Sequence, residues 1–355
     1  MVAQAMHLPH LNELQDRFAI AALAEPSASV GEALCARFAI PRGYHDWRPM
    51  VDEVPLDAVL IASPAATHVD VVLASLESGL HVFCEKPLAI TLADVDRVIE
   101  ARDRGGRVVQ VGYMKRHDPA FERALEELPP SADDLRYVSV VVNDPEWIPY
   151  FLPGDILRAA DVPAEAIDAV RRAESEQVEE AIGRGDPEAC VAFSDSYLGS
   201  LVHHVNVVNG FLERMGEPLP AQVVGGAWWN GGRAVAGYCE LQNGSRWDSV
   251  WLQLLDTREY RESIRLFFDR TLRSLTFPSP WLKMSPTVYE RHEAEGYANA
   301  VRRYRSFEEA FRRELVRFHE CCVDGATCLT PPEQARVDTE LLTEMFLAAE
   351  RARVA

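Results

Sequence analysis

The order of hydrophobic and polar positions changes once along the chain, near Leu135. Before that point, short continuous apolar runs alternate with longer segments in which apolar residues recur every three or four positions. Continuous runs are typical of parallel strands buried on both faces, and the second spacing is typical of amphipathic helices. The pattern predicts strands over 18–25, 57–62, 80–84 and 107–113, and helices over 4–15, 30–38, 67–78 and from the Thr91-x-x-Asp94 capping box to Gly105.

This alternation of strand and helix through residues 1–122 predicts a doubly wound parallel sheet of the Rossmann type. Such a domain normally begins with a strand and a G-x-G-x-x-G/A loop, and an acid about 20 residues later binds the adenosine ribose. Glu25 closes the second-strand candidate, which puts Ala3 at the third loop position and Met1 inside the phosphate loop. We therefore expect the central first strand to be missing. We favour a mis-assigned start codon over a truncated chain or a variant that has lost tight cofactor binding.

After Leu135, segments rich in Val, Trp, Tyr and Phe follow one another with Gly and Asn turns, which indicates a mostly antiparallel sheet. The predicted strands are 137–142, 221–229, 233–241, 246–255, 260–268 and 271–277, and the predicted helices are 155–185, 196–213, 306–322 and 332–353. The domains expected from this pattern are a Rossmann dinucleotide-binding domain (1–122), a mixed α/β domain for substrate binding and oligomerisation (123–330) with a helical insertion (151–193), and a C-terminal helix (331–355).

The composition of the chain excludes some classes of binding partner. The 355 residues carry a net charge of −19, which repels nucleic acid and anionic membranes. No apolar run approaches the roughly 20 residues that cross a bilayer, and the N-terminus lacks the pattern of a signal peptide, so we expect a cytoplasmic protein. The seven cysteines are scattered and lack C-x-x-C spacing, which predicts reduced thiols and no metal site.

Candidate chemistry lies in the stretch from His81 to Ala89, where an apolar strand runs into Glu85 and Lys86 and is stopped by Pro87. A lysine at the carboxyl end of a buried strand is poorly solvated, and desolvation lowers its pKa towards the range of proton exchange. The pattern therefore fits an active-site lysine, and taken alone it fits a solvated ion pair at a strand end equally well.

A second candidate is the predicted helix over 196–213, in which small and polar residues occupy one face. Spacings of three and four place His203 and Asn206 on this stripe and leave His204 off it. A polar stripe on a mostly apolar helix needs a wet cleft or a partner, which favours His203 over its neighbour as a catalytic residue. The stripe consists of positions 196, 199, 200, 203, 206 and 210.

The run ASPAATHVDVVLASLESGLHVFCEKPLAIT, followed by VQVGYMKRHDPA, closely resembles the Gfo/Idh/MocA family of sugar and cyclitol dehydrogenases. The resemblance implies a Rossmann domain followed by a domain with a large, mostly antiparallel sheet flanked by helices. It implies that Lys86 is the catalytic lysine, that Glu85 helps to bind NAD, and that Pro87 is cis to Lys86. Ser63, Pro64 and His68 would border the nicotinamide; without the family, His68 reads as a structural residue at a helix start.

The family's second-domain helix usually reads D-x-G-x-H-D-x-D, and this chain departs from it. Gly199, His204 and Asn206 replace the three acids, while His203 keeps the histidine. We therefore expect His203 to act with Lys86. Gly199 and Asn206 would lie at the substrate, and Tyr113, Lys115 and Arg116 would bind its hydroxyls or a carboxylate. For Lys115 and Arg116 the alternative is solvated surface charge.

Together, these expectations predict an NAD-dependent oxidoreductase that acts on a sugar, cyclitol or sugar-derived glycoside. Glu25 would bond the ribose 2′-hydroxyl and repel a 2′-phosphate, so NADP is disfavoured. The missing acid at Gly199 leaves open a redox-neutral lyase or hydrolase that retains NAD. The absent glycine loop leaves open a non-enzymatic sugar or dinucleotide sensor. A broad sheet with one free face favours a homodimer or homotetramer.

Overall fold

The computed structural model describes residues 1–145 and 156–354, which form two compact units. Unit 1 contains Met1–Gly112, the described residues of 151–177, and Phe311–Glu333. Unit 2 contains Val178–Ala310 and the described residues of 113–150 and 334–355. The predicted start of the insertion at residue 151 lies outside the described residues.

Short parallel strands form the core of unit 1, in two separate sheets. One sheet pairs β1 (Leu23–Ala24) with β2 (Gly43–Tyr44), and in the other β4 (His81–Glu85) lies between β3 (Ala58–Ile61) and β5 (Val109–Gly112). Every pair is parallel, which confirms the predicted Rossmann-type sheet. Among the described residues β1 pairs only with β2, and β3 pairs only with β4.

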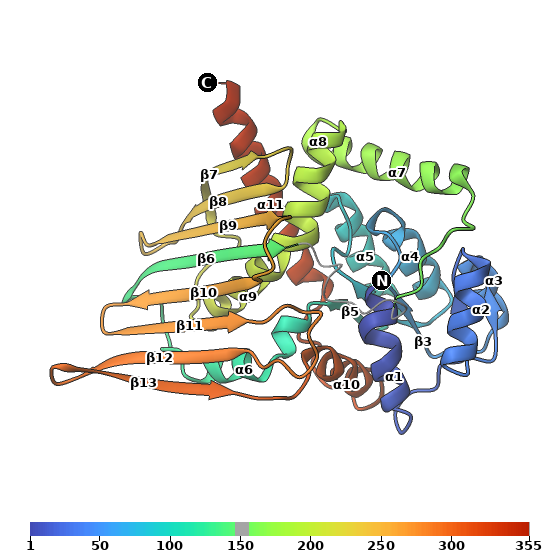
Figure 1. The fold of residues 1–355 in the computed structure, drawn as a ribbon, viewed down its shortest axis with the longest axis horizontal. Coiled ribbons are helices and arrows are strands. Elements are labelled where there is room, and N and C mark those ends of the chain that lie inside the picture. Colours follow the sequence, from blue (N-terminus) through green and yellow to red (C-terminus); the bar gives the residue numbers. More distant parts are fainter. Residues whose placement is uncertain (146–155, 355) are drawn as a thin grey trace. The chain divides into compact units, whose positions relative to one another are not determined.

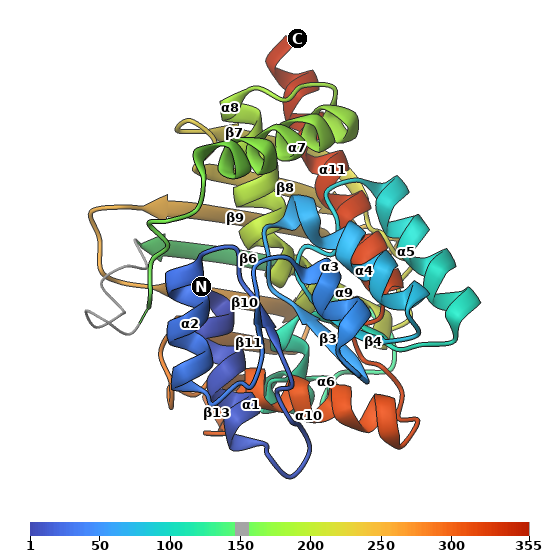
Figure 2. The same cartoon turned by 90° about the vertical axis from the view of Figure 1, so that its right-hand side faces the viewer.

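Helices pack around these strands. They are a π-helical turn (Ala3–His7), α1 (Leu8–Glu13), α2 (Ala28–Arg37), α3 (Trp47–Glu53), a 3-10 turn (Ala65–Thr67), α4 (His68–Glu77), α5 (Leu92–Gly105) and α10 (Ala310–Val323), while α7 (Ala164–Ile182) runs from unit 1 into unit 2. Helix α4 packs against β3, β4 and α5, and Figure 2 shows α4 and α5 side by side. The Thr91 side chain accepts the Asp94 N–H at 3.1 Å, which confirms the predicted start of α5.

Residues 311–333 belong to unit 1, although most of unit 2 precedes them in the sequence. Phe318 of α10 packs against Phe83 of β4. The Val111 N–H donates to the Thr330 carbonyl at 2.8 Å, and the Thr330 hydroxyl donates to the Val111 carbonyl at 2.7 Å. Residues 311–333 therefore fold with the N-terminal strands, so the chain crosses between the units several times, whereas the sequence pattern suggests one crossing near residue 122.

An eight-stranded sheet forms the core of unit 2, in the order β7-β8-β9-β6-β10-β11-β12-β13 (Figure 1). Neighbouring strands are antiparallel except β6 and β9, which confirms the predicted mostly antiparallel sheet. The strands are β6 (Leu135–Pro145), β7 (Gln222–Trp229), β8 (Ala234–Glu240), β9 (Arg246–Leu254), β10 (Arg261–Phe268), β11 (Thr271–Phe277), β12 (Val288–Glu295) and β13 (Ala298–Arg305).

The hairpin of β12 and β13 is missing from the sequence prediction. Most side chains of β13 are exposed, so this strand shows no alternation of buried and exposed positions. Its register comes from the ladder with β12 and from a turn at Gly296, which has φ of 61°. A strand that is polar on both faces leaves no hydrophobic period to detect.

The helices of unit 2 differ from the sequence prediction in the segment 196–213. They are α6 (Pro119–Glu126), α8 (Pro187–Cys190), a π-helix (Val191–Leu201), α9 (Val202–Arg214) and α11 (Pro332–Val354), which begins in unit 1. The prediction of one α-helix over 196–213 is wrong, because its first part is π-helical. A π-helix has more residues per turn than an α-helix, so positions before and after Leu201 do not share one face. Within the described ranges, no helix has the length and apolar character needed to cross a membrane.

Candidate active site

Lys86 follows directly on β4, the middle strand of the three-stranded sheet in unit 1. Val82, Phe83 and Cys84 are completely buried, so the strand fixes the place of the residue that follows it. The carboxyl edge of a parallel sheet is where α/β proteins bind their ligands. The peptide bond between Lys86 and Pro87 is cis, which confirms the expectation drawn from the family resemblance.

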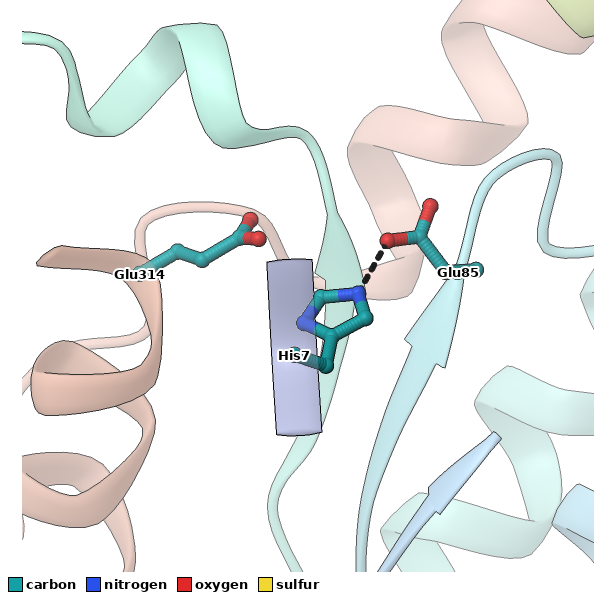
Figure 3. A group of neighbouring side chains, drawn as sticks. All are labelled: His7, Glu85 and Glu314. Carbon is teal, nitrogen blue, oxygen red and sulfur yellow. Dashed lines mark hydrogen bonds and ion pairs between the residues drawn. The ribbon is translucent and has the colours of Figure 1, made fainter. Parts of the chain in front are cut away.

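The Glu85 side chain is buried beside this lysine. One carboxylate oxygen lies 2.6 Å from His7 Nε2 (Figure 3), and the other accepts the Lys86 N–H at 3.2 Å. Gly112 faces it from β5, where an added Cβ would come within 3.1 Å of the carboxylate. Burial alone would raise the pKa of Glu85, but the hydrogen bond and charge of His7 and the nearby Lys86 bring that pKa below its usual value. Glu85 is therefore held as a carboxylate.

His68, the first residue of α4, joins two loops of unit 1. Its ring is buried, with Nδ1 2.8 Å from the Pro87 carbonyl and Nε2 2.8 Å from the Ser63 carbonyl. Burial lowers the pKa of His68. Because both ring nitrogens face backbone carbonyls, His68 positions the segments that carry Ser63 and Pro87. That it also borders a nicotinamide stays a prediction.

The other predicted cofactor residues lie after β1, after β3 and in the first helical turn. Glu25 follows β1 directly and is half-buried, and its carboxylate accepts the Ser27 N–H at 3.0 Å. Ser63 and Pro64 are exposed after β3, and Ala3 belongs to the π-helical turn. Their contacts with a dinucleotide stay predictions.

Unit 2 contains a buried charged cluster that includes Lys115, a predicted substrate residue. The Lys115 ammonium and the Tyr260 hydroxyl both donate to Glu262, and His204 Nε2 lies 2.8 Å from the same carboxylate. Lys115 is only 5% exposed, so the alternative that it is a solvated surface charge is wrong. Burial alone would raise the pKa of Glu262, but His204 and Lys115 lower it to about 2. Glu262 is therefore ionised deep inside unit 2.

Arg116 and Asn206, also predicted at the substrate, belong to a second buried network in unit 2. Arg116 donates to the Asn206 carbonyl at 3.2 Å and is itself buried, which excludes surface charge for this residue too. The side-chain amides of Asn206 and Asn209 donate to the two oxygens of Asp338 at 2.7 and 2.8 Å. Burial raises the pKa of Asp338 to about 6, although these bonds oppose the shift. The network ties α9 to α11, and substrate contacts of Arg116, Asn206 and the buried Tyr113 stay predictions.

The adjacent histidines of α9 lie in different surroundings. His203 is half-buried, whereas His204 is buried against Glu262. Gly199 lies in the π-helix, where an added Cβ would be 3.0 Å from the Ser194 carbonyl. The helical spacing of three and four residues, from which His203 was chosen, therefore does not apply to the part of the stripe that lies in the π-helix. Lys86 belongs to unit 1 and His203 to unit 2, and their joint role stays a prediction.

Sequence reasoning missed the buried acids Glu262, Glu314 and Asp338, although the pattern contains a signal for the two glutamates. Glu262 alternates with Ile264 and Leu266 along β10 and so occupies a position on the buried face. Glu314 lies one helical turn before Phe318 on the buried face of α10. A charged residue at an apolar position of either period is uncommon and indicates a buried ionic site.

The match to known sequences is concentrated in the N-terminal part. Residues 2–113 match the model of an oxidoreductase family with an NAD-binding Rossmann fold, GFO_IDH_MocA. Residues 2–113 therefore resemble the NAD-binding Rossmann domain of the Gfo/Idh/MocA family. The chain is 35% identical to the inositol 2-dehydrogenase of Salmonella paratyphi B over 117 residues, which are 32% of this chain and 35% of that protein. It is 26% identical to the myo-inositol 2-dehydrogenase of Thermotoga maritima over 207 residues, 50% of this chain and 59% of that protein.

The match thus spans about a third of the length of the Salmonella relative. Solved dehydrogenase structures, in contrast, align with nearly the whole chain. Levoglucosan dehydrogenase in complex with NADH and levoglucosan has a TM-score of 0.73 at 14% identity, covering 99% of this chain and 95% of that chain. A probable dehydrogenase from Thermotoga maritima has a TM-score of 0.67 at 17% identity, covering 98% and 94%. At these identities the likeness shows the fold alone, and the fold includes both the Rossmann-type sheet and the large antiparallel sheet.

Proposed function

We propose that this chain is an NAD-dependent oxidoreductase that transfers a hydride between nicotinamide and a hydroxyl-bearing carbon of a sugar, cyclitol or sugar derivative. The observation that carries the proposal is Lys86 at the carboxyl edge of the parallel sheet, between the buried carboxylate of Glu85 and the cis-linked Pro87. The match of residues 2–113 to a family described by its NAD-binding fold supports the cofactor, and relatives named inositol 2-dehydrogenase support the substrate class.

The groups of unit 1 fit a dinucleotide that carries a free 2′-hydroxyl. Glu25 places a half-buried carboxylate at the end of β1, where it would accept a hydrogen bond from the ribose and repel a 2′-phosphate, so NAD is preferred to NADP. Ser63 and Lys86 follow β3 and β4 at the same edge of their sheet and would hold the nicotinamide end. When bound, nicotinamide supplies the carbon that accepts or returns the hydride.

When the alcohol is oxidised, the neutral Lys86 amine would accept the hydroxyl proton, and in the reverse direction the ammonium would return it. Pro87 ends the strand, and the Glu85 carboxylate binds the Lys86 N–H, so the backbone that carries the lysine is fixed on both sides. His203 of unit 2 is the preferred second proton carrier, because Nε2 of the neighbouring His204 already faces Glu262. The joint action of Lys86 and His203 remains a prediction of the family resemblance.

Substitution of Lys86 tests the proposal. NADH formation is measured with myo-inositol, levoglucosan and UDP-N-acetylglucosamine, and NADH binding is measured by its fluorescence. For whichever compound wild type oxidises, Lys86→Met should lower kcat by about 10²-fold or more, because it removes a general acid–base group. Lys283 is exposed, so Lys283→Met is the matched control and should keep wild-type turnover.

Three results would contradict the proposal. Equal turnover by the two methionine variants would remove Lys86 from the chemistry. Conversion of a compound without net NADH would instead indicate a redox-neutral reaction. Binding of NADH or a sugar without turnover of any polyol would indicate a sensor.

We further propose that unit 2 forms a homo-oligomer through the outer face of its sheet. Val141 and Tyr238 expose 43% and 37% of their surface there, and Val250 pairs with Val141 on the same face. Apolar side chains in neighbouring strands are typical of an interface between copies. Light scattering should give a dimer or tetramer mass that falls to the monomer mass in Val141→Glu, and a monomeric wild type would refute the proposal.

A further inference from the structure

A buried cluster in unit 1 joins Glu85, a predicted cofactor residue, to two residues that have no role in the predicted chemistry. His7 of the π-helical turn, Glu85 of β4 and Glu314 of α10 converge from three elements, and Figure 3 shows the Glu314 carboxyl group directed towards the His7 ring. His7 and Glu314 are completely buried and Glu85 is 6% exposed. One nitrogen or oxygen from each residue lies within 4.8 Å of the others. We call this group the His-Glu-Glu cluster.

The hydrogen bonding of the cluster is incomplete. His7 Nε2 is 2.6 Å from a Glu85 oxygen, so a proton lies between these two atoms, and an ion bound by both residues would take the place of that proton. Nδ1 has no hydrogen-bond partner among the described residues, and neither has either oxygen of Glu314. Buried polar groups are normally paired, and each orphan costs about 1–3 kcal/mol or more when charged. Buried hydrogen-bond acceptors that lie close together without donors are stabilised by a bound cation or by a proton.

The position of Glu314 is fixed from outside the cluster. Leu315 and Phe318 of α10 pack against Phe83 of β4, and the Gln110 side chain donates to the Glu314 carbonyl at 2.9 Å. The helix therefore cannot turn its acid to solvent without exposing these apolar side chains. Burial, reinforced by repulsion from Glu85, raises the pKa of the Glu314 carboxyl well above its usual value. A divalent cation would reverse this effect and hold both carboxyls ionised.

The donor set decides which cation fits. Imidazole nitrogen and carboxylate oxygen are both ligands of Zn²⁺, and three protein ligands would leave a fourth tetrahedral position for water. Ca²⁺ requires about six to eight oxygen ligands and Mg²⁺ near-ideal octahedral oxygen geometry, and neither favours imidazole. Two carboxylates also balance the charge of one divalent ion. Sequence spacing gave no sign of such a site because its ligands come from positions 7, 85 and 314.

We propose that His7, Glu85 and Glu314 bind one Zn²⁺ ion that joins the first helical turn, β4 and α10. Binding to the folded chain stabilises it by mass action, because the three ligands are far apart in the unfolded chain. The proposal does not depend on the reaction proposed above.

Zinc titration by calorimetry, with thermal unfolding before and after dialysis against a chelator, tests the site on wild type and three variants. Glu314→Gln keeps the shape but removes a charged ligand, and it should weaken zinc binding at least about 10-fold, the smallest loss typical for groups around a metal. Glu13→Gln makes the same change on the exposed partner of His10. Cys321→Ser disrupts the contact between the Cys321 and Cys328 thiols, the other candidate zinc ligands in unit 1.

Wild type, Glu13→Gln and Cys321→Ser should each bind one Zn²⁺ per chain and gain thermal stability from it, while Glu314→Gln should not. Absence of saturable binding to wild type would overturn the proposal. Equal binding by Glu314→Gln and wild type would overturn it as well, and a loss confined to Cys321→Ser would assign the ion to the thiols. Unchanged stability of Glu314→Gln without any effect of zinc or chelator would show that Glu314 carries a proton instead.

Discussion

Replacing Lys115 by methionine tests whether the buried cluster of unit 2 is ionic. The change removes the ammonium that donates to Glu262 and keeps a side chain of similar length. Glu262 has no exposed surface, so water cannot solvate the carboxylate that is left behind. His204 and Tyr260 would still contact it, but the positive charge of the lysine would be gone.

Two independent quantities give the expected cost. Removing one partner of a buried ion pair typically costs about 3–5 kcal/mol, because it leaves an uncompensated charge. The pKa of Glu262 is lowered from 4.5 to about 2, and a shift of that size corresponds to about 3 kcal/mol that favours the ionised form. His204 contributes part of this shift, so we expect Lys115→Met to lower the free energy of unfolding at neutral pH by about 2–3 kcal/mol.

Urea unfolding followed by tryptophan fluorescence measures this loss, because Trp247 is completely buried in β9 of the same unit. Arg136→Met is the matched control. It removes the cation of the pair between Arg136 and Asp269, whose side chains are 53% and 49% exposed, and should cost at most about 1 kcal/mol. The double variant Lys115→Met/Glu262→Gln removes both charges and should be more stable than the sum of the single losses predicts.

Equal losses in Lys115→Met and Arg136→Met would refute the reasoning, since burial would then make no difference to the pair. Strict additivity in the double variant would refute it too. In that case Glu262 would not depend on Lys115 for its charge.

Two further predictions concern unit 2. The pKa of Asp338 is raised from 3.8 to about 6, so between these pH values the folded chain keeps a proton that the unfolded chain releases. The stability that the folded chain gains from this proton is complete below pH 3.8 and is lost as the pH rises to about 6. In urea titrations across this window, Asp338→Asn should lack the decrease of about 3 kcal/mol seen in wild type, and parallel pH profiles would contradict the assignment. Gly226→Ala places a Cβ 1.9 Å from the Met345 carbonyl oxygen and should cost about 3 kcal/mol or more, whereas Gly225→Ala meets only the Tyr238 ring at 3.3 Å. Thermal midpoints should separate the two alanine variants by several degrees, and similar midpoints would show that α11 can move away from the sheet.

Local signals in the sequence were sufficient for the elements that carry the predicted site. The apolar run before Glu85 predicted β4, and the spacing of Thr91 and Asp94 predicted the start of α5, because both signals act over a few neighbouring residues. The π-helix over Val191–Leu201 escaped prediction, since its residues have an apolar composition that suits an α-helix equally well. That difference matters because it breaks the stripe on which His203 was chosen.

By itself, the sequence determined that Lys86 follows a buried strand and precedes Pro87, because strand period and proline chemistry are properties of adjacent residues. Only the tertiary structure determined which acidic side chains contact which basic side chains. Glu262 meets Lys115 and His204, and Glu85 meets His7 close to Glu314, across separations that no local period encodes. The physical reason is that burial pattern selects the face a residue occupies, whereas the packing of whole elements selects its partner on that face.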